Sequence, residues 1–456
     1  MQQNITPADL ERFSAAFEAD PKNRLAANAV AKNDIAAVAL RRESVNRINH
    51  TYSHLIETPE ATKQGETGRC WMFAGLNLLR LAAIRKMNLK VEKFELSQPY
   101  LMYWDKLEKA NFFLENIIET RDEPLDGRLV MWLLADPLPD AGQWDMFVSL
   151  VKKYGVVPKT MMPETKSSAA SRMMNGRLVA KLREFAQTLR AMHARGVALD
   201  GLREAKASML TDFHRMLTIH FGRPPASFEW AWRDQDKAFH RHGAITPQEF
   251  HAEYVGIDLD DMVCLINAPT LDKPCNRLYT VAYLGNVVDG RPVRYLNADI
   301  EALKRAAVDS IVNGEAVWFG SDVEQMMEWD LGLLDMDAYD YELVYGVPFL
   351  LDKAGRLDYG QSRMTHAMLL TGVDLDERER PVKWRVENSW GTEQGDKGYM
   401  LMTDRWFEEY LYEIAVSRRY LPPELLAVLE QEPVVLPPWD PMGALAHSGR
   451  VSGVSR

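Results

Sequence analysis

Residues 64–77 read QGETGRCWMFAGLN, and this stretch places a polar loop directly before an apolar helix. The loop runs from Gln64 to Arg69 and contains two glycines. From Cys70 onward, apolar side chains recur at helical spacing, namely at Phe73, Leu76, Leu79 and Ala83. The pattern therefore predicts a buried helix whose first residue is Cys70.

A cysteine at the start of a helix has the setting that a reactive thiol needs. A helix N-terminus and a neighbouring imidazolium both lower the pKa of a thiol from its usual value of about 8.5. We therefore expect Cys70 to have a lowered pKa and to act as a nucleophile. Gln64 lies six residues upstream, and its side-chain amide can reach back and share an oxyanion with the backbone N–H of Cys70.

Two polar residues near the other end of the chain can complete such a site. His366 precedes the apolar run 367–373, which reads as a buried strand. In the next predicted strand Asn388 continues the apolar side of an alternation formed by Val382, Trp384 and Val386. Asn388 should therefore point inward and orient the ring of His366. Trp390, in the run Asn-Ser-Trp-Gly, should shield their hydrogen bond from water.

Each of these residues also has a purely structural interpretation. A single cysteine is most often a small buried hydrophobe. A histidine before an apolar run is most often a core residue, and Asn-Ser-Trp-Gly can be a simple turn. Gln-x5-Cys-Trp, a later histidine at the head of a strand and Asn-Ser-Trp-Gly are much harder to obtain together by chance. The combination favours Cys70 as a nucleophile with His366 as its base.

The composition of the whole chain excludes several other classes. The chain has 456 residues, is 46% hydrophobic and 26% charged, and carries a net charge of -11. It can therefore form a large core, and its negative charge disfavours nucleic acid as the main ligand. Its three cysteines and the absence of a signal-peptide pattern or apolar span predict a cytoplasmic protein outside the membrane. No metal site and no cofactor are expected.

The chain is predicted to be α+β and to divide into five segments. Further helices are expected at 95–118 and 302–311, and further strands at 278–283, 316–319 and 399–402. His240 and His242 read as a solvated helix end, and Cys264 and Cys275 as structural. The segments are an N-terminal helical arm at 1–60, a helical lobe with Cys70 at 61–163, a helical insertion at 164–250, a β lobe with His366 and Asn388 at 251–430, and a C-terminal arm at 431–456.

Three stretches resemble the catalytic blocks of papain-like cysteine peptidases, namely QGETGRCWMFAGLN at 64–77, THAMLLTGVD at 365–374 and ENSWG at 387–391. Over nearly its whole length the chain resembles the bleomycin hydrolase and aminopeptidase C branch, most specifically in WDPMGALA at 439–446. The resemblance implies a papain-like two-lobed fold, with a helical lobe, an antiparallel β-barrel-like lobe and a large helical insertion. It also implies Cys70 as nucleophile, His366 as general base and acid, Asn388 as orienter and Gln64 as oxyanion donor.

The same resemblance implies a thiol aminopeptidase that acts on peptides with a free N-terminus through a thioester. The branch forms a homohexameric barrel, and its C-terminal arm blocks one side of the cleft. The carboxylate at the end of that arm meets the amine of the substrate. Gly142 is expected to pair its backbone with the substrate. Ala141, Trp390 and Ala446 complete the expected substrate-binding residues.

The chain departs from this branch at two places. Ala141 stands where the family usually has a first glycine, and its methyl group can trim a subsite or shift the loop. Ten residues, HSGRVSGVSR, follow Ala446, and we hypothesise that the enzyme removes this extension itself. If the extension is retained, it weakens the restriction of cleavage to the N-terminus of a peptide and gives an endopeptidase-like variant. The alternative from another class is a barrel-forming nucleic-acid-binding protein with secondary peptidase activity, which the basic residues in 164–250 favour and the net charge disfavours.

Overall fold

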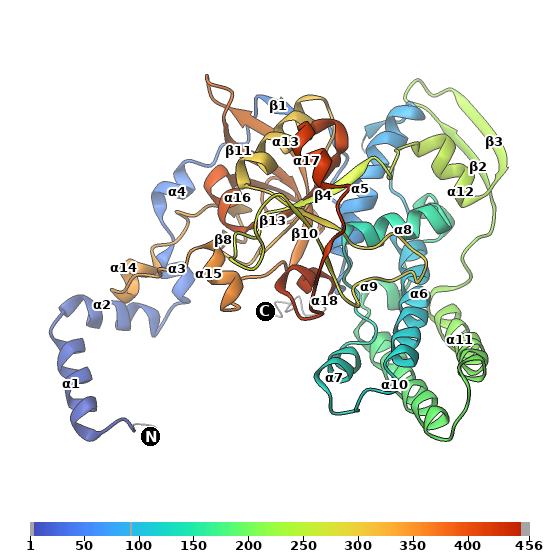
Figure 1. Ribbon diagram of the computed structural model, residues 1–456. Coiled ribbons are helices and arrows are strands. Elements are labelled where there is room, and N and C mark those ends of the chain that lie inside the picture. The colour runs from blue at the N-terminus through green and yellow to red at the C-terminus, as the bar shows by residue number, and fades with distance from the viewer. Residues whose placement is uncertain (1–3, 92–93, 448–456) are drawn as a thin grey trace.

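The structure is a computed structural model that describes residues 4–91 and 94–447. Figure 1 shows strands gathered on one side of the molecule and long helices on the other, with the first helices extending from the strand-rich side as an arm. The arm comprises α1 (Pro7–Glu18), α2 (Pro21–Val30), α3 (Ile35–Ala39) and α4 (Arg42–Asn46). Thr6 caps α1 by accepting from the backbone N–H of Asp9, and Pro7 takes the first helical position.

The helix-rich side is organised around α5 (Cys70–Lys86), which is buried along nearly its whole length. A helix that is apolar on all sides belongs in a core, and the predicted start at Cys70 is confirmed. Beside it lie α6 (Gln98–Glu119), α7 (Arg128–Ala135) and α8 (Trp144–Tyr154). The helix expected at 95–118 corresponds to α6, which begins where the hydroxyl of Ser97 accepts from the N–H of Tyr100.

The segment at 164–250 is mostly helical but also contains strands. Its helices are α9 (Lys166–Ala169), α10 (Arg172–Ala194), α11 (Leu199–Phe221) and α12 (Pro247–Phe250). Between α11 and α12, β2 (Phe228–Arg233) and β3 (Phe239–Ile245) form an antiparallel hairpin. The prediction of a helix end at His240 and His242 is therefore wrong, because both lie in β3. The hairpin is stabilised by aromatic packing, for example of Trp230 against Phe250.

Among the described residues, twelve strands form one continuous sheet in the order β14-β5-β6-β4-β13-β7-β10-β11-β12-β9-β8, with β1 paired to β10. Strands are present at each of the predicted positions. The pairing runs as an open path from β14 to β8, so closure into a barrel stays a prediction. The strands are β1 (His54–Leu55), β4 (Met262–Ile266), β5 (Arg277–Val281), β6 (Tyr295–Asn297), β7 (Val317–Ser321), β8 (Met327–Glu328), β9 (Leu333–Leu334), β10 (His366–Leu375), β11 (Pro381–Glu387), β12 (Tyr399–Thr403), β13 (Leu411–Ser417) and β14 (Val434–Leu436).

The sheet separates two hydrophobic layers. Ala367 and Leu369 of β10 belong to the layer shared with α5 and α6. Met368 and Leu370 belong to the opposite layer, which contains α13 (Ile300–Val312), α16 (Asp404–Tyr410) and α17 (Pro423–Val428). Because side chains of a strand alternate between faces, a strand covered on both sides must be apolar throughout. Two short helices, α14 (Tyr341–Tyr345) and α15 (Lys353–Asp358), precede β10.

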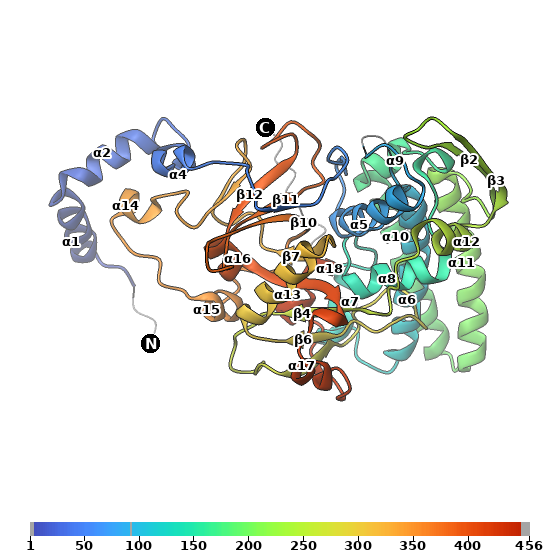
Figure 2. The ribbon, with the colours of Figure 1, turned by 90° about the horizontal axis from the view of Figure 1, so that it is seen from above.

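The C-terminal arm returns to the middle of the molecule. After β14 it forms a short turn at Pro441–Gly443 and then α18 (Ala444–His447). Figures 1 and 2 place α18 between the strand-rich and helix-rich sides. All but the first residue of the extension HSGRVSGVSR lie outside the described residues. Within residues 4–91 and 94–447, no helix is both long and apolar enough to cross a membrane.

Candidate active site

Cys70 begins α5 and lies inside the protein, with 1% of its surface exposed. The backbone N–H of Ala367, in β10, donates to its Sγ at 3.4 Å. The sulfur therefore lies beside the peptide group that joins His366 to Ala367. The fold thus brings together the predicted nucleophile and the predicted base from distant parts of the chain.

Burial dominates the protonation of Cys70. It raises the pKa of the thiol to about 11, although hydrogen bonds from backbone N–H groups, first that of Ala367, oppose the shift. The expected lowering of this pKa is therefore wrong for this state, because removal of water outweighs the helix N-terminus. Burial also lowers the pKa of His366 to about 4, against the hydrogen bond of Asn388. The thiol and the imidazole are consequently both neutral at neutral pH.

Asn388 holds His366 as the sequence predicts. Nε2 of the ring and Oδ1 of Asn388 are 2.8 Å apart, and both residues are buried. Because an amide oxygen can only accept, this bond makes Nε2 the protonated nitrogen. Nδ1 of His366 is buried and has no hydrogen-bond partner among the described residues. It is therefore the basic nitrogen of the neutral ring, free to take a proton.

Trp390 covers the imidazole. Its ring centroid lies 4.7 Å from that of His366, with the two planes inclined by 30°. Trp329 stacks on Trp390 at 4.3 Å and 23°. The two indoles form an apolar cover that excludes water and so contributes to the low pKa of His366. The shielding role predicted for Trp390 fits this geometry, whereas no local pattern pointed to Trp329.

Gln64 is buried, and its side-chain amide has two partners. Its Nε2 donates to the carbonyl oxygen of Thr67 at 2.6 Å, and its Oε1 accepts from Oγ of Ser389 at 2.7 Å. The backbone N–H of Gln64 also donates to the carbonyl oxygen of Ser389 at 2.8 Å. Because the amide nitrogen carries two hydrogens, a second N–H remains for a developing oxyanion. Ser389 was missed by the sequence reasoning, although it adjoins Asn388.

Ala141 and Gly142 lie in the loop between α7 and α8, against the start of α5. A Cβ at Gly142 would stand 2.8 Å from the indole ring of Trp71, so glycine is required for this close approach. Nε1 of that indole donates to the carbonyl oxygen of Asp140 at 2.8 Å. The carbonyl of Ala141 accepts from Nζ of Lys109 at 2.6 Å. These contacts fix the loop, and its pairing with a substrate stays a prediction.

Hydrogen bonds hold the C-terminal arm against this loop and the sheet. The carbonyl oxygen of Met442 accepts from the hydroxyl of Tyr295 at 3.1 Å and from Nε2 of Gln143 at 3.4 Å. The carboxylate of Asp440 lies 3.1 Å from Nζ of Lys273, and both side chains are buried. Since Gln143 belongs to the loop described above, the arm and the loop are directly connected.

Leu445, near the end of the arm, packs on the strand next to β10. A Cβ at Gly320, in β7, would stand 3.5 Å from Cδ2 of Leu445. Gly320 is paired across the sheet with Ala367, whose N–H contacts the sulfur of Cys70. Leu445 therefore packs on β7 at the residue paired with Ala367, and the next residue, Ala446, is buried.

Other sequence features take no part in this site. Cys264 is buried in β4, whereas Cys275 is exposed in the loop before β5, so the structural interpretation does not hold for Cys275. His240 contacts Asp234 across the hairpin. In the part of the chain that the structure describes, no group of three or more His, Cys, Asp or Glu residues could hold a metal ion.

Comparison with known sequences identifies similar proteins. The Peptidase C1-like family model matches residues 4–443. Bleomycin hydrolase of Mus musculus is 46% identical over 449 residues, which cover 96% of this chain and 98% of that protein. Aminopeptidase C of Listeria monocytogenes is 44% identical over 448 residues, which cover 98% of this chain and 100% of that protein.

A solved structure extends the comparison to three dimensions. PepW from Lactobacillus rhamnosis HN001 matches with a TM-score of 0.95 at 46% sequence identity, covering 98% of this chain and 100% of that chain. The two proteins therefore share one arrangement of helices and sheet over essentially their full length.

Proposed function

The chain belongs to the Peptidase C1-like family, and we propose that it is a papain-like cysteine aminopeptidase that removes N-terminal residues from peptides. The observation that carries the proposal is the arrangement at the start of α5. There the Sγ of Cys70 contacts the peptide N–H that follows His366, and the ring of His366 is oriented by Asn388. The names of the similar proteins, bleomycin hydrolase and aminopeptidase C, support a peptidase that acts on N-termini.

In the proposed acylation, Nδ1 of His366 takes the proton of the Cys70 thiol. The thiolate then attacks the carbonyl carbon of the scissile bond, and the carbonyl oxygen becomes an oxyanion. The backbone N–H of Cys70 and the free N–H of Gln64 stabilise this oxyanion. The imidazolium of His366 returns the proton to the leaving amine, the C–N bond breaks, and a thioester remains on Cys70.

In the proposed deacylation the same groups act on water. His366, neutral again, takes a proton from a water molecule, whose oxygen attacks the thioester carbonyl. The second oxyanion occupies the same position, and it collapses when the C–S bond breaks. His366 then returns the proton to Cys70, which restores the neutral thiol and imidazole of the resting site.

The C-terminal arm supplies a reason for action at a free N-terminus. Leu445 packs on β7 at Gly320, the residue paired with Ala367 of β10, and Ala446 beside it is buried. We take this to place the arm in the cleft between the two proposed lobes. A peptide with further residues on that side would collide with the arm, whereas a substrate that ends there fits. A carboxylate at the end of the arm would in addition attract the ammonium group of the substrate.

We also propose that the protein assembles as a homohexamer. The support is a set of exposed large apolar side chains, which are typical of subunit interfaces. They are Ile5 before α1, Leu10, Phe13, Phe17 and Leu25 on α1 and α2, and Leu343, Tyr345, Val347, Phe349 and Leu350 on and after α14. The expected mass in multi-angle light scattering is six times that of the chain.

A free, exposed Cys275 suits a reducing, cytoplasmic location.

The function is tested with unblocked and amino-blocked aminoacyl amides. Wild type should hydrolyse the unblocked substrate only, and Cys70→Ala should hydrolyse neither. Cys275→Ala is the matched control, because it removes an exposed thiol. This variant should be as active as wild type and should lose its activity on alkylation as wild type does. Activity that survives in Cys70→Ala would overturn the assignment, and efficient cleavage of blocked substrates would show an endopeptidase-like enzyme instead.

A further inference from the structure

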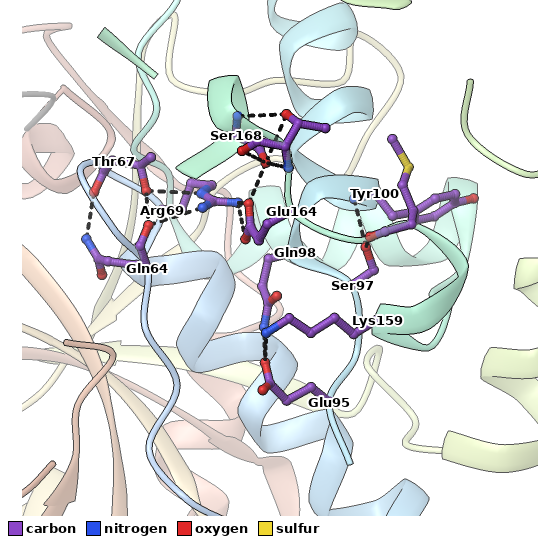
Figure 3. A network of polar contacts seen from close by, with 12 residues as sticks. Gln64, Thr67, Arg69, Glu95, Ser97, Gln98, Tyr100, Lys159, Glu164 and Ser168 are labelled. Carbon is purple, nitrogen blue, oxygen red and sulfur yellow. Dashed lines mark hydrogen bonds and ion pairs between the residues drawn. The ribbon is translucent and has the colours of Figure 1, made fainter. Parts of the chain in front are cut away.

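The loop that carries Gln64 is built around one buried cation. Arg69 has no exposed surface, and its guanidinium has three partners (Figure 3). Nε donates to Oγ1 of Thr67 at 3.0 Å, and Nη2 donates to the carbonyl oxygen of Gln64 at 3.1 Å. Nη1 lies 3.1 Å from Oε1 of Glu164. Two of these bonds stay inside the loop, and the third leaves it.

The two partners inside the loop are the residues that set the Gln64 amide. The carbonyl of Thr67 accepts from Nε2 of Gln64 at 2.6 Å, and the hydroxyl of Thr67 donates to the carbonyl of Gln64 at 2.9 Å. The guanidinium of Arg69 therefore holds both residues of this pair, through the hydroxyl of Thr67 and the carbonyl oxygen of Gln64. Arg69 also directly precedes Cys70, whose backbone N–H is the second proposed oxyanion donor. A shift of the guanidinium would move both donors.

Glu164 supplies the charge that a buried guanidinium needs. A cation removed from water is tolerated only with a hydrogen-bonded counter-charge. Burial lowers the pKa of Arg69, and the carboxylate of Glu164 opposes this. Glu164 is held in turn by the hydroxyl of Ser168, in α9. The same region contacts the loop again, because the N–H of Glu66 donates to the carbonyl of Ala169 at 2.9 Å.

We propose that Arg69 and Glu164 are positioning residues that align the two oxyanion donors. Glu164, from the segment that leads into α9, fixes the guanidinium of Arg69, and Arg69 fixes the loop around Gln64. Neither side chain touches the reacting atoms. The inference rests on the proposed function, since it assigns these residues to the oxyanion step of that reaction.

Glu164→Gln tests the pair, because it removes the charge and keeps the shape. Loss of an oxyanion donor lowers kcat about 100- to 1000-fold, and misalignment should cost less, about tenfold, with KM within about twofold. Alkylation of Cys70 by iodoacetamide forms no oxyanion, so its rate should stay within about twofold of wild type. Arg69→Lys keeps the positive charge but loses the planar guanidinium that donates to several partners at once. It should lower kcat by at least as much as Glu164→Gln does.

Glu115→Gln is the matched control. Glu115 pairs with Lys206 and Arg203 between α6 and α11, and its side chain is 19% exposed, against 25% for Glu164. This substitution should leave kcat unchanged. It reports the effect of breaking a partly buried ion pair of similar exposure in the same helix-rich half.

A double-mutant cycle separates positioning from simple support of the fold. In the background Gln64→Ala, the effect of Glu164→Gln on kcat should shrink from about tenfold to about twofold, because only the Cys70 N–H remains to be misaligned. The proposal would be overturned if the effects of the two substitutions on kcat were fully additive. It would also be overturned if Glu164→Gln lowered the alkylation rate as much as kcat, or if it left kcat at the wild-type value. Failure of the proposed function shows differently, as absent wild-type turnover of unblocked substrates.

Discussion

The hydrogen bond between His366 and Asn388 gives a direct test of the site through Asn388→Ala. The Nε2–H of His366 is buried, and its acceptor, Oδ1 of Asn388, lies at 2.8 Å. Within the part of the chain that the structure describes, the amide nitrogen of Asn388 has one weak contact, to Sδ of Met400 at 3.6 Å. The substitution therefore leaves the ring N–H without an acceptor and releases the orientation of the imidazole.

The magnitude follows from the burial of that donor. A buried N–H that loses its acceptor costs about 1 to 3 kcal/mol. The bond is stronger for the imidazolium of the transition state than for the neutral resting ring, and the unanchored ring must also be reoriented there, so a loss of this size falls on the barrier. Since about 1.4 kcal/mol is a factor of ten, kcat/KM should fall about 5- to 150-fold. KM should change little, because Asn388 is buried and not exposed to substrate.

Asn388→Asp is the matched variant, because it keeps an acceptor in the same place. A carboxylate there raises the pKa of His366 by its charge. Alanine instead removes the hydrogen bond that opposes the burial-induced lowering of this pKa to about 4. The acidic limb of the kcat/KM profile should therefore move to higher pH in Asn388→Asp and to lower pH in Asn388→Ala.

The assay is hydrolysis of an unblocked aminoacyl amide between about pH 3 and 9, with active enzyme counted by alkylation of Cys70. Counting the active thiols separates a slower site from a smaller folded fraction. Activity of Asn388→Ala within about twofold of wild type would refute the assigned orientation. Identical acidic limbs in the two variants would refute the assigned pKa argument.

Two further substitutions test the loop and the buried acid beneath the arm. Gly142→Ala places a Cβ 2.8 Å from the ring of Trp71, so differential scanning calorimetry should show a loss of about 1 to 3 kcal/mol in stability, and a neutral result would contradict the close packing. Burial raises the pKa of Glu413 from 4.5 to about 8, so the unfolded chain ionises first and stability falls as pH rises between these values. Glu413→Gln should therefore raise the unfolding temperature relative to wild type at about pH 8 but not at about pH 4, and an equal difference at both would contradict the shift.

Much of the site was predictable because its residues lie in local patterns. A polar loop followed by helical apolar spacing places the start of a helix at Cys70, where α5 begins. The alternation through Trp384 and Val386 places Asn388 inward, and it is buried. Such patterns depend only on neighbours in the sequence, so they can be read without the fold. The predicted family is confirmed by the comparisons.

Features that depend on distant partners could not be predicted. No local pattern singles out Lys109, which the fold brings to the carbonyl of Ala141. The hairpin containing Trp232 contacts the end of α5, which is far away in sequence. There Nε1 of Trp232 donates to the carbonyl oxygen of Met87, the C-cap residue of α5. The prediction that the pKa of the Cys70 thiol is lowered was wrong for the same reason, because the burial that raises this pKa is set by the whole fold. The five-segment division of the chain stays a prediction.

The run Asn388-Ser389-Trp390 performs more than the turn that its composition suggests. Oδ1 of Asn388 accepts from the ring of His366 and, at 2.7 Å, from the backbone N–H of Ser389. The hydroxyl of Ser389 donates to Oε1 of Gln64, and the indole of Trp390 covers the ring of His366. A turn needs only backbone geometry, so these side-chain bonds are not explained by local folding. They join the base and the oxyanion donor into one hydrogen-bonded chain, and a displacement of this run would therefore disturb proton transfer and oxyanion binding together.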